Sequence, residues 1–518
     1  MRRKIALFAL SIIVIAAPII VAATLIYAKL GVSLTNFVPF WYDELWHWHQ
    51  TATFAEVGFN GGYYTLDEQI PVFDFSHYYT WGAWLYVYYG SVARFLDTNL
   101  TSFMFINIGT FLAATALFIG LVRPSFEKLL LLGAVLATFV PLLQYIPSNM
   151  PLVFQLSIAI LISGGFYHLF TRQVSTRFVI SATVLLLLAG LSRPTFAVFL
   201  FPLYVLASKE RNWKTVLRAV AISVPLTALS ATIFSLTSAP YPFLRTRLFL
   251  EAGTIGEKIA GIIEYLRLSS IWLRTEGDTL TFAMRYQILF LLALLLGWGA
   301  YLLWQRRRGQ RKAQDTSPVL WEIAFHLFNL LGFYALTILF HEVLGGHDYR
   351  VMAPHLFISL TVLVAMRRRV LVLIMVLASL ATFPALWTLL AVKDPNYNGI
   401  AQTQFIEWQP ILADVLVYDP DVPNAWCNTL SVSEYYTRPF AGDAGLILAT
   451  PSGIGISWLF NWEESERFTI PEVLKARYLM LHRDDFESWQ ERLNVRHMVD
   501  VQEGAIYDNL DSLCYMED

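Results

Sequence analysis

Long apolar runs alternate with short polar segments over the first 391 residues of the chain. A membrane core about 30 Å thick is crossed by roughly 20 apolar residues in a helix, and about eleven runs suit that role. They lie at 5–28, 101–122, 128–146, 150–170, 178–191, 194–207, 215–237, 284–304, 320–342, 351–366 and 370–391. The fifth and sixth runs are short and are joined by Ser192-Arg193-Pro194, which predicts a hairpin or a broken helix. The pattern predicts an all-α polytopic membrane bundle.

The pattern changes after residue 391. The tail 392–518 is richer in charge, and it contains short runs typical of strands at Gly445–Thr450 and Tyr478–Leu481. We therefore predict two parts: a membrane domain over 1–391, which includes a long loop at 29–100, and a small soluble α/β domain over 392–518.

Composition supports the membrane assignment. Hydrophobic residues make up 56% of the 518 residues and charged residues only 15%, against about 25% charged in soluble domains. The net charge of −2 gives no indication of a nucleic-acid partner. No predicted cytoplasmic segment carries the glycine pattern of a nucleotide-binding loop, so an activated group must come from the membrane or from outside.

The distribution of Lys and Arg predicts the orientation. Six segments hold 19 of the 37 Lys and Arg but only three acidic residues; they are 1–4, 123–128, 171–177, 208–218, 305–318 and 366–369. Basic segments remain in the cytoplasm, and the proposed spans place all six there. The loop 29–100 and the C-terminal domain then lie outside the cell membrane.

Two local features have alternative interpretations. The first span follows Arg2, Arg3 and Lys4 and is longer than the apolar part of a cleaved signal, which favours a signal-anchor over a cleaved signal. Cys427 and Cys514 both fall in the predicted outer domain. An oxidising compartment would allow a disulfide between them; two buried thiols are the alternative.

Two acidic pairs lie in the loop 29–100. Asp43 and Glu44 stand among aromatic residues just after the first span, where desolvation raises a carboxyl pKa and favours general-base chemistry. Asp67 and Glu68 follow a Gly-Gly turn in the same loop. Solvated surface carboxylates are the alternative interpretation of both pairs.

Basic residues that could bind an anion lie at two predicted outer turns. Arg193 occupies the hairpin between two apolar segments, where an arginine could hold a lipid phosphate or only extend to the headgroups. A second turn contains His347, Asp348, Tyr349 and Arg350, with Arg350 as the anion ligand. Its spacing matches no strong zinc motif, so we predict no metal site, although a divalent cation is compatible with the residues.

Together these motifs resemble those of the GT-C superfamily of membrane glycosyltransferases. The similarity is to an acidic pair after the first span, a Gly-then-basic-Pro hairpin, and an outer Tyr-Arg-x-x-x-Pro turn that opens a late span. The branch that it most resembles contains the protein O-mannosyltransferases and aminoarabinose transferases. The resemblance covers roughly residues 1–391.

The resemblance implies transfer of a sugar from a polyprenyl-phosphate carrier to a protein, lipid or glycan acceptor on the outer face. It implies that Asp43 is the base or orients the acceptor, with Glu44 beside it, and that Arg193 and Arg350 contact the carrier phosphate. Arg193 stands where that branch often has Lys. The His-Trp-His sequence after the acidic pair, at 47–49, also differs from the family pattern.

Three other classes of function remain as alternatives. A transporter or flippase of lipid-linked glycans would be expected to show inverted repeats and charges at mid-membrane depth. A ligase or polymerase acting on lipid-linked glycans would place its key residues in a large late loop. A membrane sensor would bind its ligand in the outer domain.

Overall fold

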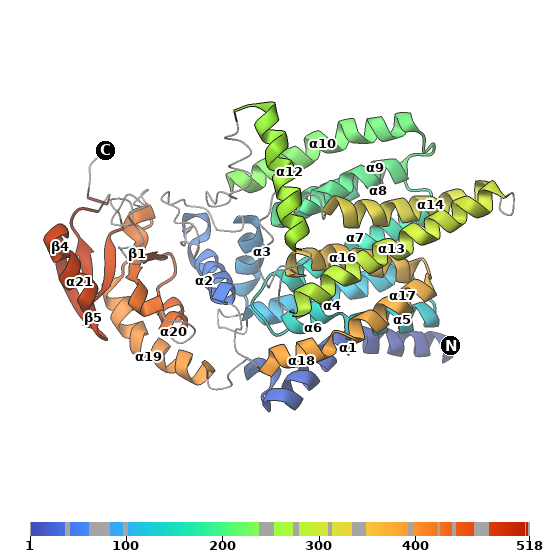
Figure 1. Ribbon diagram of the computed structural model, residues 1–518. Coiled ribbons are helices and arrows are strands. Elements are labelled where there is room, and N and C mark those ends of the chain that lie inside the picture. Colours follow the sequence, from blue (N-terminus) through green and yellow to red (C-terminus); the bar gives the residue numbers. More distant parts are fainter. Residues whose placement is uncertain are drawn as a thin grey trace.

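The computed structural model is a helical bundle with a small α/β domain at one end (Figure 1). It describes residues 2–36, 42–61, 83–96, 102–237, 253–272, 279–308, 313–333, 349–391, 397–421, 425–437, 442–459, 476–512 and 514–515. The all-α bundle and the C-terminal α/β domain predicted from sequence are both confirmed.

Each of the eleven predicted spans coincides with helical residues. The bundle comprises α1 (Arg2–Leu30), α4 (Ser102–Val122), α5 (Phe126–Thr138), α6 (Val140–Tyr145), α7 (Leu152–Thr171), α8 (Thr176–Ser192), η3 (Pro194–Phe199), α9 (Leu200–Ala207), α10 (Trp213–Leu236), α13 (Thr279–Arg307), α14 (Ala313–Leu327), η4 (Phe328–Gly332), α16 (Tyr349–Ala365), α17 (Arg369–Leu380) and α18 (Phe383–Ala391). Within the described ranges, six helices are long and apolar enough to cross a membrane. The chain is an integral membrane protein. The part of the ninth predicted span beyond residue 333 lies outside the described residues.

The third predicted span is broken. Phe139 has an extended backbone between α5 and α6, and Pro141 follows in the first turn of α6. Proline lacks the amide hydrogen that would continue the helix and clashes with the preceding turn. The short helix α6 then leads into the turn 145–151, which contributes to the site described below.

Lipid exposure explains the high apolar content. Helix α1 buries Val14, Ala22 and Ile26 but exposes apolar residues such as Phe8 and Ile13. Helix α16 is the opposite case, because nearly all its side chains from Met352 to Ala365 are buried. It packs against α5 and α7 and shares one hydrophobic core with them, so α16 is a central helix of the bundle.

The predicted loop 29–100 contains two helices in its described part, α2 (Tyr42–Val57) and α3 (Ala83–Ala93), with the short turns η1 (Leu34–Asn36) and η2 (Gly58–Gly61). Helix α3 packs on α4, where the Tyr89 ring stacks on Phe103 at 3.9 Å between centroids. A side chain at Gly90 would come within 2.7 Å of Phe54 on α2, so glycine permits the close contact of α2 with α3. Another helix, α12 (Ile255–Trp272), lies between α10 and α13 in the chain.

The C-terminal domain contains a five-stranded sheet in the order β2-β1-β3-β5-β4. Its elements are α19 (Tyr397–Val415), η5 (Ala425–Asn428), β1 (Thr429–Ser433), η6 (Glu434–Thr437), α20 (Gly442–Ala449), β2 (Gly455–Leu459), β3 (Tyr478–His482), α21 (Arg483–Trp489), η9 (Gln490–Arg492), β4 (Val495–Val501) and β5 (Gly504–Asn509). β1 pairs in parallel with β2 and β3, and β5 pairs antiparallel with β3 and β4.

One of the two predicted strands is correct. Tyr478–Leu481 lies in β3, but the prediction of a strand at Gly445–Thr450 was wrong, since residues up to Ala449 form α20. A short apolar run does not distinguish a buried strand from a buried helix. Here α20 packs against α19 and crosses between the parallel strands β1 and β2.

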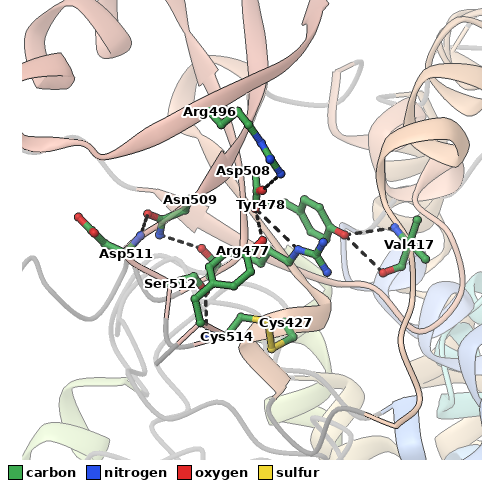
Figure 2. Close-up of polar contacts among 12 residues, drawn as sticks. Val417, Cys427, Arg477, Tyr478, Arg496, Asp508, Asn509, Asp511, Ser512 and Cys514 are labelled. Carbon is green, nitrogen blue, oxygen red and sulfur yellow. Dashed lines mark hydrogen bonds and ion pairs between the residues drawn. A yellow bond between two sulfur atoms is a disulfide. The ribbon is translucent and has the colours of Figure 1, made fainter. Parts of the chain in front are cut away.

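A disulfide joins Cys427 and Cys514, whose Cα atoms are 4.9 Å apart. Figure 2 shows this bridge beside a network centred on the buried Asp508. Tyr515 donates a 2.6 Å hydrogen bond to Asp508, and Arg496 forms an ion pair with it. The bridge and Tyr515 therefore hold the end of the chain against the sheet.

Candidate active site

The acidic pair begins helix α2. Acidic residues in the first turn of a helix are favoured by the helix dipole. Glu44 is buried, and its Oε2 accepts a 2.9 Å hydrogen bond from the backbone N–H of Asn149. Asp43 belongs to the same turn of α2, and its side chain lies outside the described residues. Glu44 thus fixes the start of α2 on the turn 145–151.

The turn 145–151 is itself held by buried polar contacts. The Asn107 amide donates to the carbonyls of Ser148 (3.3 Å) and Met150 (2.9 Å), and Tyr89 donates to Asn107 Oδ1 (2.6 Å). These bonds satisfy backbone groups that helices α6 and α7 leave free in the turn. Glu44 therefore rests on a rigid support.

The two histidines of α2 that follow the acidic pair contact different parts of the protein. His47 Nδ1 lies 2.7 Å from Tyr86 Oη on α3. His49 faces the C-terminal domain, where it hydrogen-bonds the backbone of Thr450. Burial lowers the pKa of His49 from 6.5 to about 4, because the imidazolium loses hydration, although the bond to Thr450 opposes the shift.

Helix α2 also packs against the C-terminal domain. Leu45 is buried in a hydrophobic cluster with Trp408, Leu412 and Leu446. The Gly453 N–H lies 3.4 Å from Thr53 Oγ1, and Figure 1 shows α2 between the bundle and α20. The acidic pair thus lies at the end of the bundle that faces the soluble domain, called here the domain end.

Arg193 lies at the same end, in the predicted hairpin. Its backbone is extended between α8 and η3. Its guanidinium donates to three neutral acceptors: Gln155 Oε1, Thr195 Oγ1 (3.3 Å from Nε) and the Val351 carbonyl. No carboxylate of the described residues forms an ion pair with Arg193. Among the described residues, neutral groups alone hold its positive charge in place.

Arg350 is close enough to act electrostatically on Arg193. Both side chains are partly buried. Arg350 occupies the first turn of α16, and the next residue, Val351, accepts a hydrogen bond from Arg193. Two like charges repel each other, and a multiply charged anion bound between them would relieve that repulsion. The two arginines predicted from sequence are thus brought together.

Helix α7 connects the acidic pair with the arginines. Asn149, which binds Glu44, lies in the turn just before α7, and Gln155, which binds Arg193, lies in its first turn. Gln155 is three positions after Leu152, the first residue of α7, a rise of about 4.5 Å along the helix. One short stretch of chain therefore contacts both sets of predicted site residues.

The side chains of the remaining predicted site residues are not among those that the structure describes. Asp67, Glu68, His347 and Asp348 fall outside the described residues, and Tyr349 begins α16 with an undescribed side chain. Among the described ranges, no group of three or more His, Cys, Asp or Glu is arranged to hold a metal ion.

Sequence reasoning missed the polar residues that surround Arg193. Gln155, Thr195 and His355 lie within apolar spans, where each looks like an isolated polar residue. Their common signal is that polar groups are costly inside a membrane helix and usually have partners there. Without knowledge of the packing, that signal could not connect them.

The sequence of the chain matches no protein-family model and no curated protein. Two solved structures have a similar overall path. The apo structure of ArnT from Cupriavidus metallidurans has 11% identity and a TM-score of 0.41, and the same protein bound to undecaprenyl phosphate has 12% and 0.38. Each match covers 98% of this chain and 99% of the other.

Proposed function

We propose that this protein is a membrane glycosyltransferase that moves a sugar from a polyprenyl-phosphate carrier to an acceptor at the domain end of the bundle. The observation that carries the proposal is the position of Arg193, which neutral groups hold among the described residues, beside Arg350; the start of α7 joins it to the acidic pair. The order of motifs along the sequence, which resembles that of the GT-C glycosyltransferases, supports it.

The domain end faces the outside of the cell membrane in this proposal. The disulfide between Cys427 and Cys514 supports that orientation, because disulfides persist in oxidising compartments. At the opposite end, Lys128 donates to the Ala365 carbonyl, and Arg367 and Arg369 pair with Glu127. Two of the basic segments that favour the cytoplasm thus meet there.

The proposed reaction is a single displacement. Asp43 accepts the proton of an acceptor hydroxyl as its oxygen forms a bond to the anomeric carbon of the sugar. The bond from that carbon to the phosphate oxygen breaks, and the polyprenyl phosphate leaves with the electron pair. Arg193 and Arg350 stabilise the negative charge on the leaving phosphate, and the anomeric centre is inverted.

The adjacent carboxylates are assigned different roles. Glu44 is buried and accepts the Asn149 N–H, so we assign it to holding the start of α2. Asp43 is then the base. His347, Asp348 and Tyr349 precede Arg350, and with Asp67 and Glu68 they remain proposed substrate contacts that follow from the sequence.

The test is transfer of a labelled sugar from a polyprenyl-phosphate sugar in membranes that contain the wild type, Asp43→Asn or Glu44→Gln. Asn preserves the size of Asp but cannot act as a base. We expect transfer by the wild type, a loss of at least about 100-fold in correctly inserted Asp43→Asn, and a loss of insertion or stability in Glu44→Gln. A wild type that transfers no sugar from several donors would favour a transporter or a sensor instead.

A further inference from the structure

A chain of hydrogen-bonded side chains extends from the partly buried Arg193 and Thr195 to buried residues in the centre of the bundle. Thr195 Oγ1 lies 3.3 Å from Arg193 Nε and 3.1 Å from His355 Nε2. His355 Nδ1 lies 2.8 Å from Asn329 Oδ1. The Asn329 amide nitrogen donates to the His355 carbonyl (2.7 Å) and to Ser359 Oγ (2.9 Å). These residues come from three separate segments, the hairpin, η4 and α16.

The donors and acceptors of this chain are consistent with a neutral His355. Arg193 Nε can only donate, so Thr195 Oγ1 accepts from it, and the hydroxyl hydrogen is available to His355 Nε2. The Asn329 amide nitrogen is a donor in both its bonds, so Oδ1 faces His355 and accepts from Nδ1–H. A second proton on Nε2 would place a buried positive charge near Arg193, which is unfavourable, so we assign His355 as neutral with its proton on Nδ1.

The aromatic surroundings support the same orientation of the imidazole. The His355 ring stacks on Phe333 with centroids 4.0 Å apart and planes 16° apart. Phe333 also lies beneath the Arg193 guanidinium, 5.9 Å from its carbon. Phe333 follows the π-helical turn η4, in which Asn329 lies. Wide turns of this kind are frequent at functional sites, and here the turn directs Asn329 toward α16.

We infer that His355 is a positioning residue for Arg193: as an Nδ1–H imidazole anchored by Asn329, it orients Thr195 so that the guanidinium points toward the anion site. The inference rests on the proposed function, because it assigns a purpose to the orientation of Arg193. It adds a second segment, η4 with Asn329, to the residues that determine phosphate binding.

The experiment compares two amides at position 355. His355→Gln places an acceptor near the position of Nε2, so the bond to Thr195 is retained. His355→Asn places its polar atoms near the position of Nδ1, so that bond is lost. Both variants lose the imidazole ring and its stacking on Phe333, so their thermal stabilities should fall by similar amounts. Each variant also keeps one of the two imidazole bonds: Gln keeps the bond to Thr195 and loses the bond to Asn329 Oδ1, and Asn does the reverse.

The measurement is the equilibrium binding of a short-chain polyprenyl monophosphate, without sugar, to the full chain in detergent micelles. We expect His355→Gln to bind within about threefold of the wild type and His355→Asn to bind about tenfold more weakly, as expected for one hydrogen bond. Thr195→Val, which keeps the shape of threonine, should bind as weakly as His355→Asn. Ser192→Ala is the matched control, since among the described residues the Ser192 hydroxyl bonds only the Ala189 carbonyl of its own helix.

The outcomes separate the inference from the proposed function. Normal binding by His355→Asn and Thr195→Val, with binding lost in Arg193→Gln, would overturn the positioning role and leave the phosphate site intact. A wild type that binds no polyprenyl phosphate would overturn the proposed function.

Nitrogen NMR of protein labelled in histidine reports the protonation state and tautomer of His355 without lipid, with His355→Gln to assign the signal. It therefore tests the hydrogen-bond chain directly. An imidazolium or an Nε2–H tautomer there would overturn it.

Discussion

The two ends of the bundle hold arginines in different ways. At the opposite end, Arg368 forms two hydrogen bonds with the buried Glu322, at 2.8 and 2.6 Å, and Arg367 and Arg369 pair with Glu127. At the domain end, Arg193 is surrounded by an amide, a hydroxyl and a carbonyl. A paired arginine contributes to the structure, whereas an arginine held by neutral groups can offer its charge to a ligand, as we propose for Arg193.

The largest effect on stability is expected at the opposite end. Arg368→Met would leave Glu322 buried without the cation that it binds, at a cost of about 3–5 kcal/mol in the free energy of unfolding. The double variant with Glu322→Met should recover most of that loss, because it removes both charges. Thermal unfolding in micelles measures both. A small loss in the single variant would show that this pair is not structural and would remove the contrast between the ends.

Arg193→Gln should reduce sugar transfer strongly and stability only slightly, in contrast to Arg368→Met. No described carboxylate pairs with Arg193, so the loss of stability should be smaller than in Arg368→Met, about 1–2 kcal/mol for the acceptors that lose a donor. Sugar transfer should fall by about 100- to 1000-fold, as when one donor to a developing anion is removed. Arg172→Gln makes the same change in charge at an exposed position after the other end of α7 and should retain activity. Unchanged transfer in Arg193→Gln would contradict the assignment.

Lowering the pH should destabilise the contact between α2 and the C-terminal domain more than the rest of the bundle. The pKa of His49 is about 4 when folded and 6.5 when exposed, so the unfolded state binds the proton first as pH falls. The contribution of His49 is complete above pH 6.5 and is lost toward pH 4, by about 3 kcal/mol at 1.36 kcal/mol per pH unit.

Hydrogen exchange of α2 and α20 amides between pH 7.5 and 4.5, corrected for intrinsic rates, measures this loosening. Helices α4 and α16 serve as internal references within the same protein. His49→Gln should remove the dependence on pH, since an amide does not titrate. Equal protection of α2 at both pH values in the wild type would show that His49 does not couple the domain to the bundle.

The sequence predicted the membrane fold well because apolar length is a strong local signal. Each proposed span is mostly helical where described, although Phe139 breaks the third, and the break at Ser192-Arg193-Pro194 separates α8 from η3. It did not reveal that the acidic pair begins helix α2, because the mixed polar and aromatic residues there follow no amphipathic period. Nor did it reveal the hydrogen-bond chain from Arg193 to Asn329, in which bonded partners are up to 160 residues apart in the sequence. Such contacts depend on packing.

The smallest effect distinguishes two buried histidines. His355 is bonded at both ring nitrogens, whereas neither nitrogen of His326 has a hydrogen-bond partner in the part of the chain that the structure describes. A buried polar atom without a partner costs free energy, and replacing it with an apolar group of similar size is nearly neutral. His326→Leu should therefore change stability by less than about 1 kcal/mol, while His355→Leu, which strands Asn329 and Thr195, should cost about 2–3 kcal/mol. The unfolding temperatures of the two variants measure these losses. A larger loss in His326→Leu than in His355→Leu would mean that burial alone makes a histidine essential to this bundle. The argument that its hydrogen bonds distinguish His355 would then fail.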